Sequence, residues 1–173
     1  MDPEKKVNGI SIVTSPYNQF ENPLYSNNKI IGTYVNSIMA LHDAIERGSD
    51  EALLLDSNEN ISEGSGENLF IVKNEELITP TPDNCLNGIT RQSIIKIAQD
   101  ENIDVIEKKL KYEDLVDADE AFFTGTAVEV TPISKVDETT IGDSMIGPIT
   151  KKLQKIFTDT VTNKNKKYAH WLD

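Results

Sequence analysis

The chain has 173 residues and a formal net charge of −12, a length that fits one domain with a buried core. Nucleic acids and anionic membrane surfaces are bound through clustered cations, so this charge argues against both as partners. The single cysteine, Cys85, fits a reducing compartment because no disulfide can form within the chain. With no signal peptide and no run near the ~20 apolar residues of a membrane span, we expect a cytoplasmic protein.

The first part of the chain predicts a strand, a loop and a helix. Met1–Asn8 is polar and is expected to be disordered. Alternating apolar and polar residues predict a strand over Gly9–Ser15, and the two prolines and four asparagines of Pro16–Asn28 predict a loop. Apolar residues at helical spacing predict a helix over Thr33–Arg47, with Gly48 as its stop.

The middle of the chain predicts strands followed by a helix. Apolar runs predict strands over Glu51–Leu55 and Ser65–Lys73, and a hairpin joins the second of these to Leu77–Thr79. After a loop with two prolines, Thr90 is expected to be the N-cap of an amphipathic helix over Arg91–Asp100.

The last part predicts four more strands and a closing helix. The expected strands are Ile103–Lys109, Glu120–Thr124, Val128–Pro132 and Val136–Ile141. A short helical turn is expected over Glu113–Val116 and a closing helix over Pro148–Val161. The tail Tyr168–Asp173 is expected to dock its aromatic side chains.

The segment Ile61–Phe70 (ISEGSGENLF) places two glycines, two acids and an amide between apolar runs. Glycine lets a backbone approach a ligand closely. Because an acid beside buried strands needs a partner, Glu63 or Glu67 either pairs with protein cations or faces a ligand that carries a protonated nitrogen. On spacing alone, a polar hairpin turn is the commoner interpretation.

Five segments follow one another along the chain: ISEGSGENLF, NGITRQSIIKIA, ADEAFFTGTAVEVTPI, GPITKKLQKIF and YAHWLD. In this order they resemble the fold-type IV (class IV) aminotransferases that use pyridoxal 5′-phosphate, and most closely the branched-chain amino acid aminotransferases. The resemblance implies a mixed α/β (α+β) fold, the large C-terminal domain of the D-amino-acid aminotransferase-like fold, with residues 1–173 as one domain. The smaller N-terminal domain of the family, with its phosphate-binding arginine, is expected to be absent.

The resemblance also implies roles for individual residues. Lys29 stands five residues before Tyr34 in K-x-x-G-x-Y and corresponds to the catalytic lysine that forms a Schiff base with the cofactor, although most lysines are solvated surface residues. Tyr34 would contact the phenolate oxygen of the cofactor. Glu63 would keep the ring nitrogen protonated, as the ring requires to accept electrons, while Glu67 and Asn68 would brace the turn.

Two backbone sites are implied for the cofactor phosphate. Ile89 and Thr90 lie at an expected helix start, where free N–H groups and the helix dipole favour an anion, although ordinary caps far outnumber phosphate sites. Gly125 and Thr126 follow a predicted strand and would join the same anion. Ala127 would present its backbone to the substrate carboxylate.

The chain departs from the family at several positions. The loop segment Tyr17–Phe20 lacks the usual basic residues, and Ile30, Ile31 and Thr33 replace smaller or amide residues. Neither Arg47 nor Arg91 matches the position of the missing arginine.

The sequence lacks the residues that metal sites, serine hydrolase sites and cysteine nucleophile sites require. The two histidines, His42 and His170, have no spaced partners for a metal. The G-x-S-x-G motif of serine hydrolases is absent, and Cys85 has no nearby histidine to activate it.

Two functions stay open. One is transamination of branched-chain L-amino acids to 2-oxo acids, with 2-oxoglutarate and glutamate as the partner pair, in branched-chain amino acid biosynthesis. The enzyme would be truncated or split, acting as a dimer or other homo-oligomer or with a partner chain that supplies the missing domain. The other is a non-catalytic remnant or interaction module. If the chain is an enzyme, a D-amino acid aminotransferase and an aminodeoxychorismate lyase are alternatives, because these relatives have the same cofactor site. The segments YAHWLD and GPITKK favour the branched-chain group.

Overall fold

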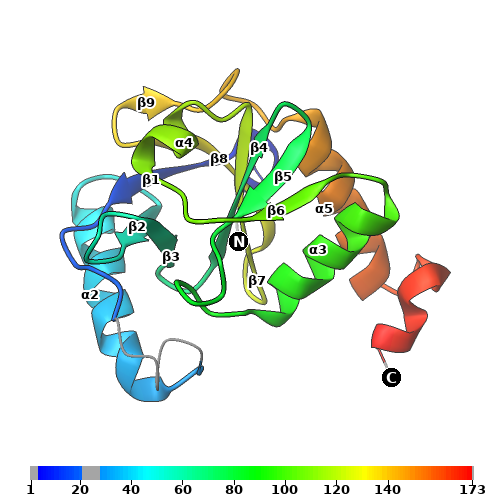
Figure 1. Cartoon of the computed structure of the whole chain (residues 1–173), viewed down its shortest axis with the longest axis horizontal. Coiled ribbons are helices and arrows are strands. Elements are labelled where there is room, and N and C mark those ends of the chain that lie inside the picture. The colour runs from blue at the N-terminus through cyan, green and yellow to red at the C-terminus, as the bar shows by residue number, and fades with distance from the viewer. Residues whose placement is uncertain (1–3, 21–27, 173) are drawn as a thin grey trace.

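The computed structural model describes residues 4–20 and 28–172, in which nine strands form a mixed sheet with helices around it (Figure 1). The strands are β1 (Ile10–Thr14), β2 (Glu51–Leu55), β3 (Ile61–Gly64), β4 (Asn68–Lys73), β5 (Glu76–Thr79), β6 (Val105–Glu107), β7 (Glu120–Gly125), β8 (Glu129–Val136) and β9 (Thr139–Thr140). The helices are α1 (Lys5–Asn8), α2 (Tyr34–Glu46), α3 (Ile89–Asp100), α4 (Tyr112–Val116), α5 (Pro148–Val161) and the 3₁₀ helices η1 (Ile31–Thr33) and η2 (Lys166–Trp171).

The strand order is β3-β2-β1-β8-β7-β4-β5-β6, with β9 beside β8. β1 runs parallel to β2 and β8, and β5 runs parallel to β6, whereas the other strand pairs are antiparallel. The predicted mixed α/β fold is therefore confirmed.

The sheet curls, because the two ends of its strand order lie close together. Ile61 of β3 donates its backbone N–H to the carbonyl of Leu110 (2.7 Å), just beyond β6. A large cluster of buried apolar side chains comes from one side of seven of the strands, β1 to β5, β7 and β8. Helices α3 and α5 lie side by side over a second cluster on β4, β5, β7 and β8 (Figure 1). Helix α2 covers a third cluster beside β1 and β2.

β2 has the bounds that the sequence predicted because both of its faces are covered. Leu53 belongs to the large cluster, whereas Ala52 and Leu54 pack with the buried side of α2. A strand buried on both faces has an almost continuous apolar sequence, and the apolar residues of β2 predict the strand for that reason. α5 also has its predicted bounds and begins with Pro148, a residue well suited to the first helical position.

The prediction for the segment before β4 was wrong. The sequence predicted one strand over Ser65–Lys73, but Ile61–Gly64 already forms β3, paired antiparallel with β2. The chain turns at residues 65–67, and β4 begins at Asn68. Ile61 and Ser62 are fully buried, so this stretch gains more from pairing with β2 than from serving as an exposed turn.

Thr90 is not the N-cap of α3, as the sequence predicted. The helix begins at Ile89, one position before Thr90, and Gly88 stands at the N-cap in an extended conformation with no side-chain cap. A Cβ atom placed on Gly88 would lie 2.5 Å from Asn68 Oδ1, so a larger residue here would force the Asn68 side chain to shift.

Both ends of the described chain are held by side-chain contacts. Within the segment expected to be disordered, α1 is held by the ion pairs Lys5–Asp50 (2.6 Å) and Lys6–Glu129 (2.5 Å). At the other end, Tyr168 is buried and stacks on Trp171 with ring centroids 4.5 Å apart. The tail therefore docks through Tyr168, as predicted, while Trp171 stays about one-third exposed.

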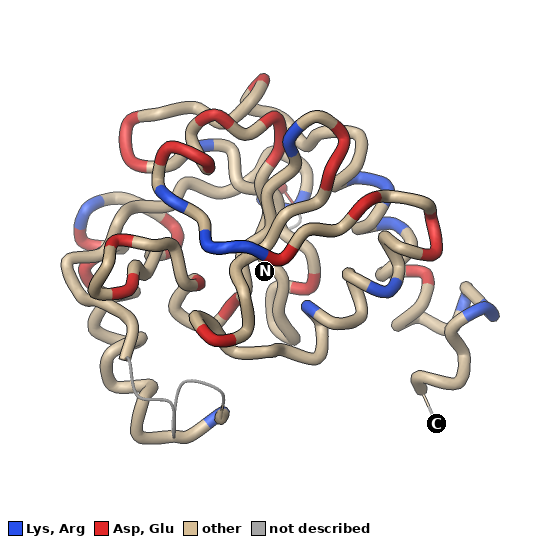
Figure 2. The backbone as a smooth tube through the Cα atoms, viewed as in Figure 1, with Lys and Arg blue, Asp and Glu red and all other residues tan. Residues whose placement is uncertain are grey.

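Acidic residues are spread along much of the backbone, with lysines between them (Figure 2). Within the described residues, no helix is long and apolar enough to cross a membrane. In the same part of the chain, no group of three or more His, Cys, Asp or Glu side chains is placed to hold a metal ion.

Arg91 holds together the loop between β5 and α3. The side chain is almost fully buried, and it donates to Pro80 O (2.9 Å) and Asn87 Oδ1 (3.1 Å) and pairs with Glu107 (2.5 Å). The loop is fastened to β3 as well, since Asn84 Nδ2 donates to Ile61 O (2.8 Å) and Ser62 Oγ donates to Asn84 O. Arg91 is thus a structural residue.

We predict that Arg91→Ala lowers the free energy of unfolding by about 3 kcal/mol, because buried loop carbonyl groups lose a charged donor. Arg47, whose side chain is 45% exposed at the end of α2, is the matched control. Arg47→Ala is expected to cost less than about 1 kcal/mol. Urea unfolding followed by circular dichroism measures both, and equal losses in the two variants would contradict this role for Arg91.

Candidate functional site

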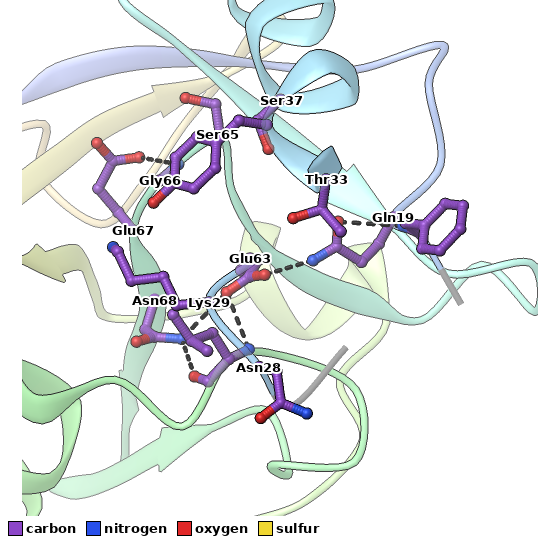
Figure 3. A pocket seen from close by; sticks show the side chains of 13 residues that line it. Gln19, Asn28, Lys29, Thr33, Ser37, Glu63, Ser65, Gly66, Glu67 and Asn68 are labelled. Carbon is purple, nitrogen blue, oxygen red and sulfur yellow. Dashed lines mark hydrogen bonds between the residues drawn. The ribbon is translucent and has the colours of Figure 1, made fainter. Parts of the chain in front are cut away.

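A cavity of about 70 Å³ lies beside the turn between β3 and β4 (Figure 3). Side chains from four separate parts of the chain line it. They are Gln19 and Phe20; Asn28, Lys29, Thr33, Tyr34 and Ser37; Glu63, Ser65, Gly66, Glu67 and Asn68; and Leu86. Three residues with roles implied by the sequence, Lys29, Tyr34 and Glu63, therefore border the same cavity.

Lys29 and Tyr34 flank the short helix η1 at the start of α2. The Lys29 side chain is exposed, and its Nζ lies 5.6 Å from the centre of the Tyr34 ring. Because η1 makes one tight turn between them, two residues that are five positions apart reach the same cavity.

Glu63 projects from β3 and accepts hydrogen bonds from three different segments. The Gln19 side-chain amide donates to Oε1, while the Leu86 backbone N–H (3.1 Å) and Asn68 Nδ2 (3.3 Å) donate to Oε2 (Figure 3). Burial raises the pKa of Glu63 to about 7, although the hydrogen bonds and the nearby Lys29 charge lower it. A carboxyl group that is half ionised near neutral pH is suited to share a proton with a basic ligand atom.

Asn68 connects the cavity to the start of α3. Its Nδ2 donates to Leu86 O (2.6 Å) in addition to Glu63, and its Oδ1 faces Gly88. No side chain caps the N-terminus of α3. At the N-terminus of α5, by contrast, the Glu120 carboxylate accepts from the backbone N–H groups of Ile149 (3.0 Å) and Thr150 (2.7 Å). The N–H groups at the start of α3 thus lack the carboxylate cap that α5 has.

Ile89 and Thr90 do not line the cavity at Glu63. Ile89 is 83% exposed and Thr90 is buried, and both border a separate hollow between α3, α5 and the C-terminal tail. Their backbone lies directly after Gly88, which touches Asn68, so the start of α3 adjoins the Glu63 cavity without forming its wall.

The hairpin between β7 and β8 contacts residues that line the Glu63 cavity. A Cβ atom on Gly125 would lie 3.4 Å from Gly66 O and 3.6 Å from Glu67 Cγ, so Gly125 packs directly against the β3–β4 turn. Thr126 and Ala127 follow in the exposed part of the hairpin and do not line the cavity.

Glu67 borders the Glu63 cavity and also a neighbouring one, which Glu51 lines too. Burial and the facing Glu51 raise the pKa of Glu67 to about 7. Glu67 Oε2 accepts from the Gly66 N–H (2.9 Å), and Glu51 Oε1 accepts from the Ser65 N–H (3.3 Å). The two acids therefore hold the backbone of the turn.

Three contributors were not singled out from the sequence: Gln19, Glu51 and Leu86. Leu86 acts through its backbone N–H, which leaves no mark on the sequence, and Glu51 stands at the start of a strand, just before its apolar residues. In the sequence, Gln19 stands out only as part of a loop without basic residues. The buried thiol of Cys85 is unsuited to act as a nucleophile, because burial raises its pKa to about 12.

The chain was then compared with known proteins. The family model for amino-transferase class IV matches residues 1–136. The branched-chain-amino-acid aminotransferase of Pseudomonas aeruginosa is 44% identical over 172 residues, which cover 99% of this chain and 56% of that protein. The chain thus spans about half the length of the curated relatives it matches.

Solved structures agree with the sequence matches. The branched-chain aminotransferase of Thermoproteus uzoniensis with norvaline has a TM-score of 0.91 and 40% identity, covering 99% of this chain and 57% of that one. The branched-chain amino acid aminotransferase of Thermobaculum terrenum in its PLP-form has a TM-score of 0.91 and 29% identity, with the same coverages of 99% and 57%. The expected fold, that of the class IV aminotransferases, is confirmed.

The acids at the turn predict a pH-dependent stability. Folding raises the pKa of Glu67 from 4.5 to about 7, so the folded state binds this proton more tightly than the unfolded state. The resulting stabilisation is fully present below pH 4.5 and is lost as the pH rises through 7. Glu67→Gln should remove up to about 3 kcal/mol of the fall in unfolding free energy between pH 5 and pH 8.

Urea unfolding at a series of pH values measures this difference. The control is Glu75→Gln, at an exposed position in the β4–β5 turn, which should retain the full pH dependence. Parallel curves for wild type and Glu67→Gln would show that the turn acids do not carry the effect.

Proposed function

Since the chain belongs to the class IV aminotransferases, as a homologue of the branched-chain enzymes, we propose that it binds pyridoxal 5′-phosphate between Lys29, Tyr34 and Glu63. We further propose that it forms the cofactor-binding part of an enzyme that transaminates branched-chain L-amino acids and 2-oxo acids, with glutamate and 2-oxoglutarate as the partner pair. The observation that carries the proposal is the shared cavity: an amine, a phenol and a buried carboxyl group from two distant segments border one space.

The residues present fit the proposed cofactor in chemistry. When bound, pyridoxal phosphate supplies an electron sink for negative charge at the substrate Cα. Glu63, buried and of raised pKa, would hold the proton at the ring nitrogen, since a carboxylate beside a cationic ring favours the charged form of both. The Tyr34 hydroxyl would donate to the ring phenolate oxygen. Lys29 Nζ would bond to the cofactor and, once freed, move a proton at the substrate Cα.

The phosphate would be held mainly by backbone groups. The uncapped start of α3 offers the N–H groups of Ile89 and Thr90 and the positive end of the helix dipole. Gly125 and Thr126 would add N–H and hydroxyl donors from the facing hairpin, and the Ala127 backbone would meet the substrate carboxylate. Arg91 takes no part in this because its terminal guanidinium nitrogens bind Pro80 O, Asn87 Oδ1 and the Glu107 carboxylate, away from the cavity.

The present cavity is smaller than the cofactor requires. Its volume of about 70 Å³ is well below the roughly 300–1,000 Å³ of small-molecule sites. Binding therefore requires side chains that line the cavity to move apart. A chain that keeps the fold without catalysis, as a remnant or interaction module, could still bind the cofactor weakly, so reaction of the loaded chain with an amino acid distinguishes the two functions.

A labelling experiment tests cofactor binding. The chain is mixed with pyridoxal phosphate, reduced with borohydride, digested and examined by mass spectrometry. We expect one pyridoxyl label, on Lys29, and its loss in Lys29→Ala but not in Lys151→Ala, at an exposed position on α5. Labels scattered over surface lysines, or none, would favour the non-catalytic alternative.

Glu63→Gln tests the role of the buried carboxyl group. The variant is isosteric but neutral, so it removes the charge that faces the ring nitrogen. We expect the dissociation constant for pyridoxal phosphate, measured by fluorescence, to rise about 10- to 100-fold. Glu75→Gln serves again as the control and should bind as wild type does.

A spectral change on adding L-leucine to the loaded chain, slowed in Glu63→Gln, would support transamination. The same change with D-leucine alone would instead favour the D-amino acid relative. Unaltered affinity in Glu63→Gln would remove this carboxyl group from the site.

A further inference from the structure

Gln19 is held in place through both its backbone and its side chain. Its backbone N–H donates to Leu55 O (2.8 Å), which fixes the residue at the end of β2. Its amide Nε2 donates to Glu63 Oε1, and its amide oxygen accepts from the Phe20 N–H (3.2 Å). Figure 3 shows the Gln19 amide pointing at the Glu63 carboxylate across the cavity. The residue therefore forms a wall of the cavity at its central acid.

Glu63 has one oxygen that faces groups fixed by the fold and one that faces Gln19. Oε2 accepts from the Leu86 backbone and from Asn68, and Asn68 is buried at the start of β4. These donors belong to the strand and to the loop that Arg91 fastens, so they are not free to withdraw. Oε1 is the oxygen bonded to a side chain from the loop after β1. A ring nitrogen that donates to Glu63 from the cavity would reach Oε1.

We propose that Gln19 occupies the cofactor's place on Glu63 in the free chain and must swing away when pyridoxal phosphate binds, so that Gln19 limits the affinity for the cofactor. This inference rests on the proposed function. The amide supplies a neutral donor where the cofactor would supply a charged one, and the charged donor forms the stronger hydrogen bond with a carboxylate. The exchange thus favours the bound state while keeping the buried acid paired in its absence. Removal of Gln19 would also widen the small cavity.

Cofactor affinity in Gln19 variants provides the first test. In Gln19→Ala the dissociation constant for pyridoxal phosphate, measured by fluorescence titration, is expected to fall about 2- to 10-fold, the worth of one intramolecular hydrogen bond. Gln19→Met keeps the length of the side chain without a donor and serves if the alanine variant does not fold. Asn18→Ala, at an exposed neighbouring position outside the cavity, is the control and should match wild type.

The wild-type chain provides a second readout that needs no variant. In a ¹⁵N-labelled sample, the Gln19 side-chain amide is expected to shift to the position of a solvated amide when pyridoxal phosphate is added. An amide that keeps its free-chain shift in the loaded protein would overturn the inference.

The outcomes separate this inference from the proposed function. Binding in wild type with equal or weaker affinity in Gln19→Ala would overturn the inference alone, because Gln19 would then support Glu63 in the bound state. Binding in Gln19→Ala but not in wild type would support both. Absence of binding in every variant would overturn the proposed function and this inference with it.

Discussion

The site depends on the burial of one carboxyl group. Glu63 sits on a strand beside a packed interior, where an ionised acid is costly unless donors surround it. Donors come from the loop after β1, from β4 and from the loop before α3, three segments far apart in sequence. The acid therefore draws together the parts of the chain that make the cavity, and its pKa near 7 follows from the same burial.

The curled sheet makes that convergence possible. The contact of Ile61 with Leu110 brings the start of β3 to the region after β6. Arg91 holds the adjoining loop, from which the Leu86 N–H reaches Glu63. Gly88 then lets the start of α3 press against Asn68. Each of these contacts is structural by itself. Together they bring the uncapped start of α3 next to Asn68, which donates to the Glu63 carboxylate.

The charge of the whole chain and the charge of the site are separate matters. The acidic residues behind the net charge of −12 are spread along much of the backbone (Figure 2), and this charge bears on macromolecular partners rather than on a small anion. At the site, the local features are Lys29, the two acids Glu63 and Glu67, and the dipole of α3. The N-terminus of α5 has the same dipole but is neutralised by Glu120, so the difference between the two helix ends lies in one capping carboxylate.

The sequence by itself determined the family, the mixed fold, the bounds of β2 and α5, and the choice of Lys29, Tyr34 and Glu63 as residues of one site. These depend on apolar periodicity and on short segments in a set order, which are local properties. Tertiary structure alone decided that residues 61–64 form a strand and that α3 begins at Ile89. It also decided that Gln19 and the Leu86 N–H bond to Glu63, and that Glu51 faces Glu67. Pairing, close approach and shared burial join residues distant along the chain, and no local pattern records them.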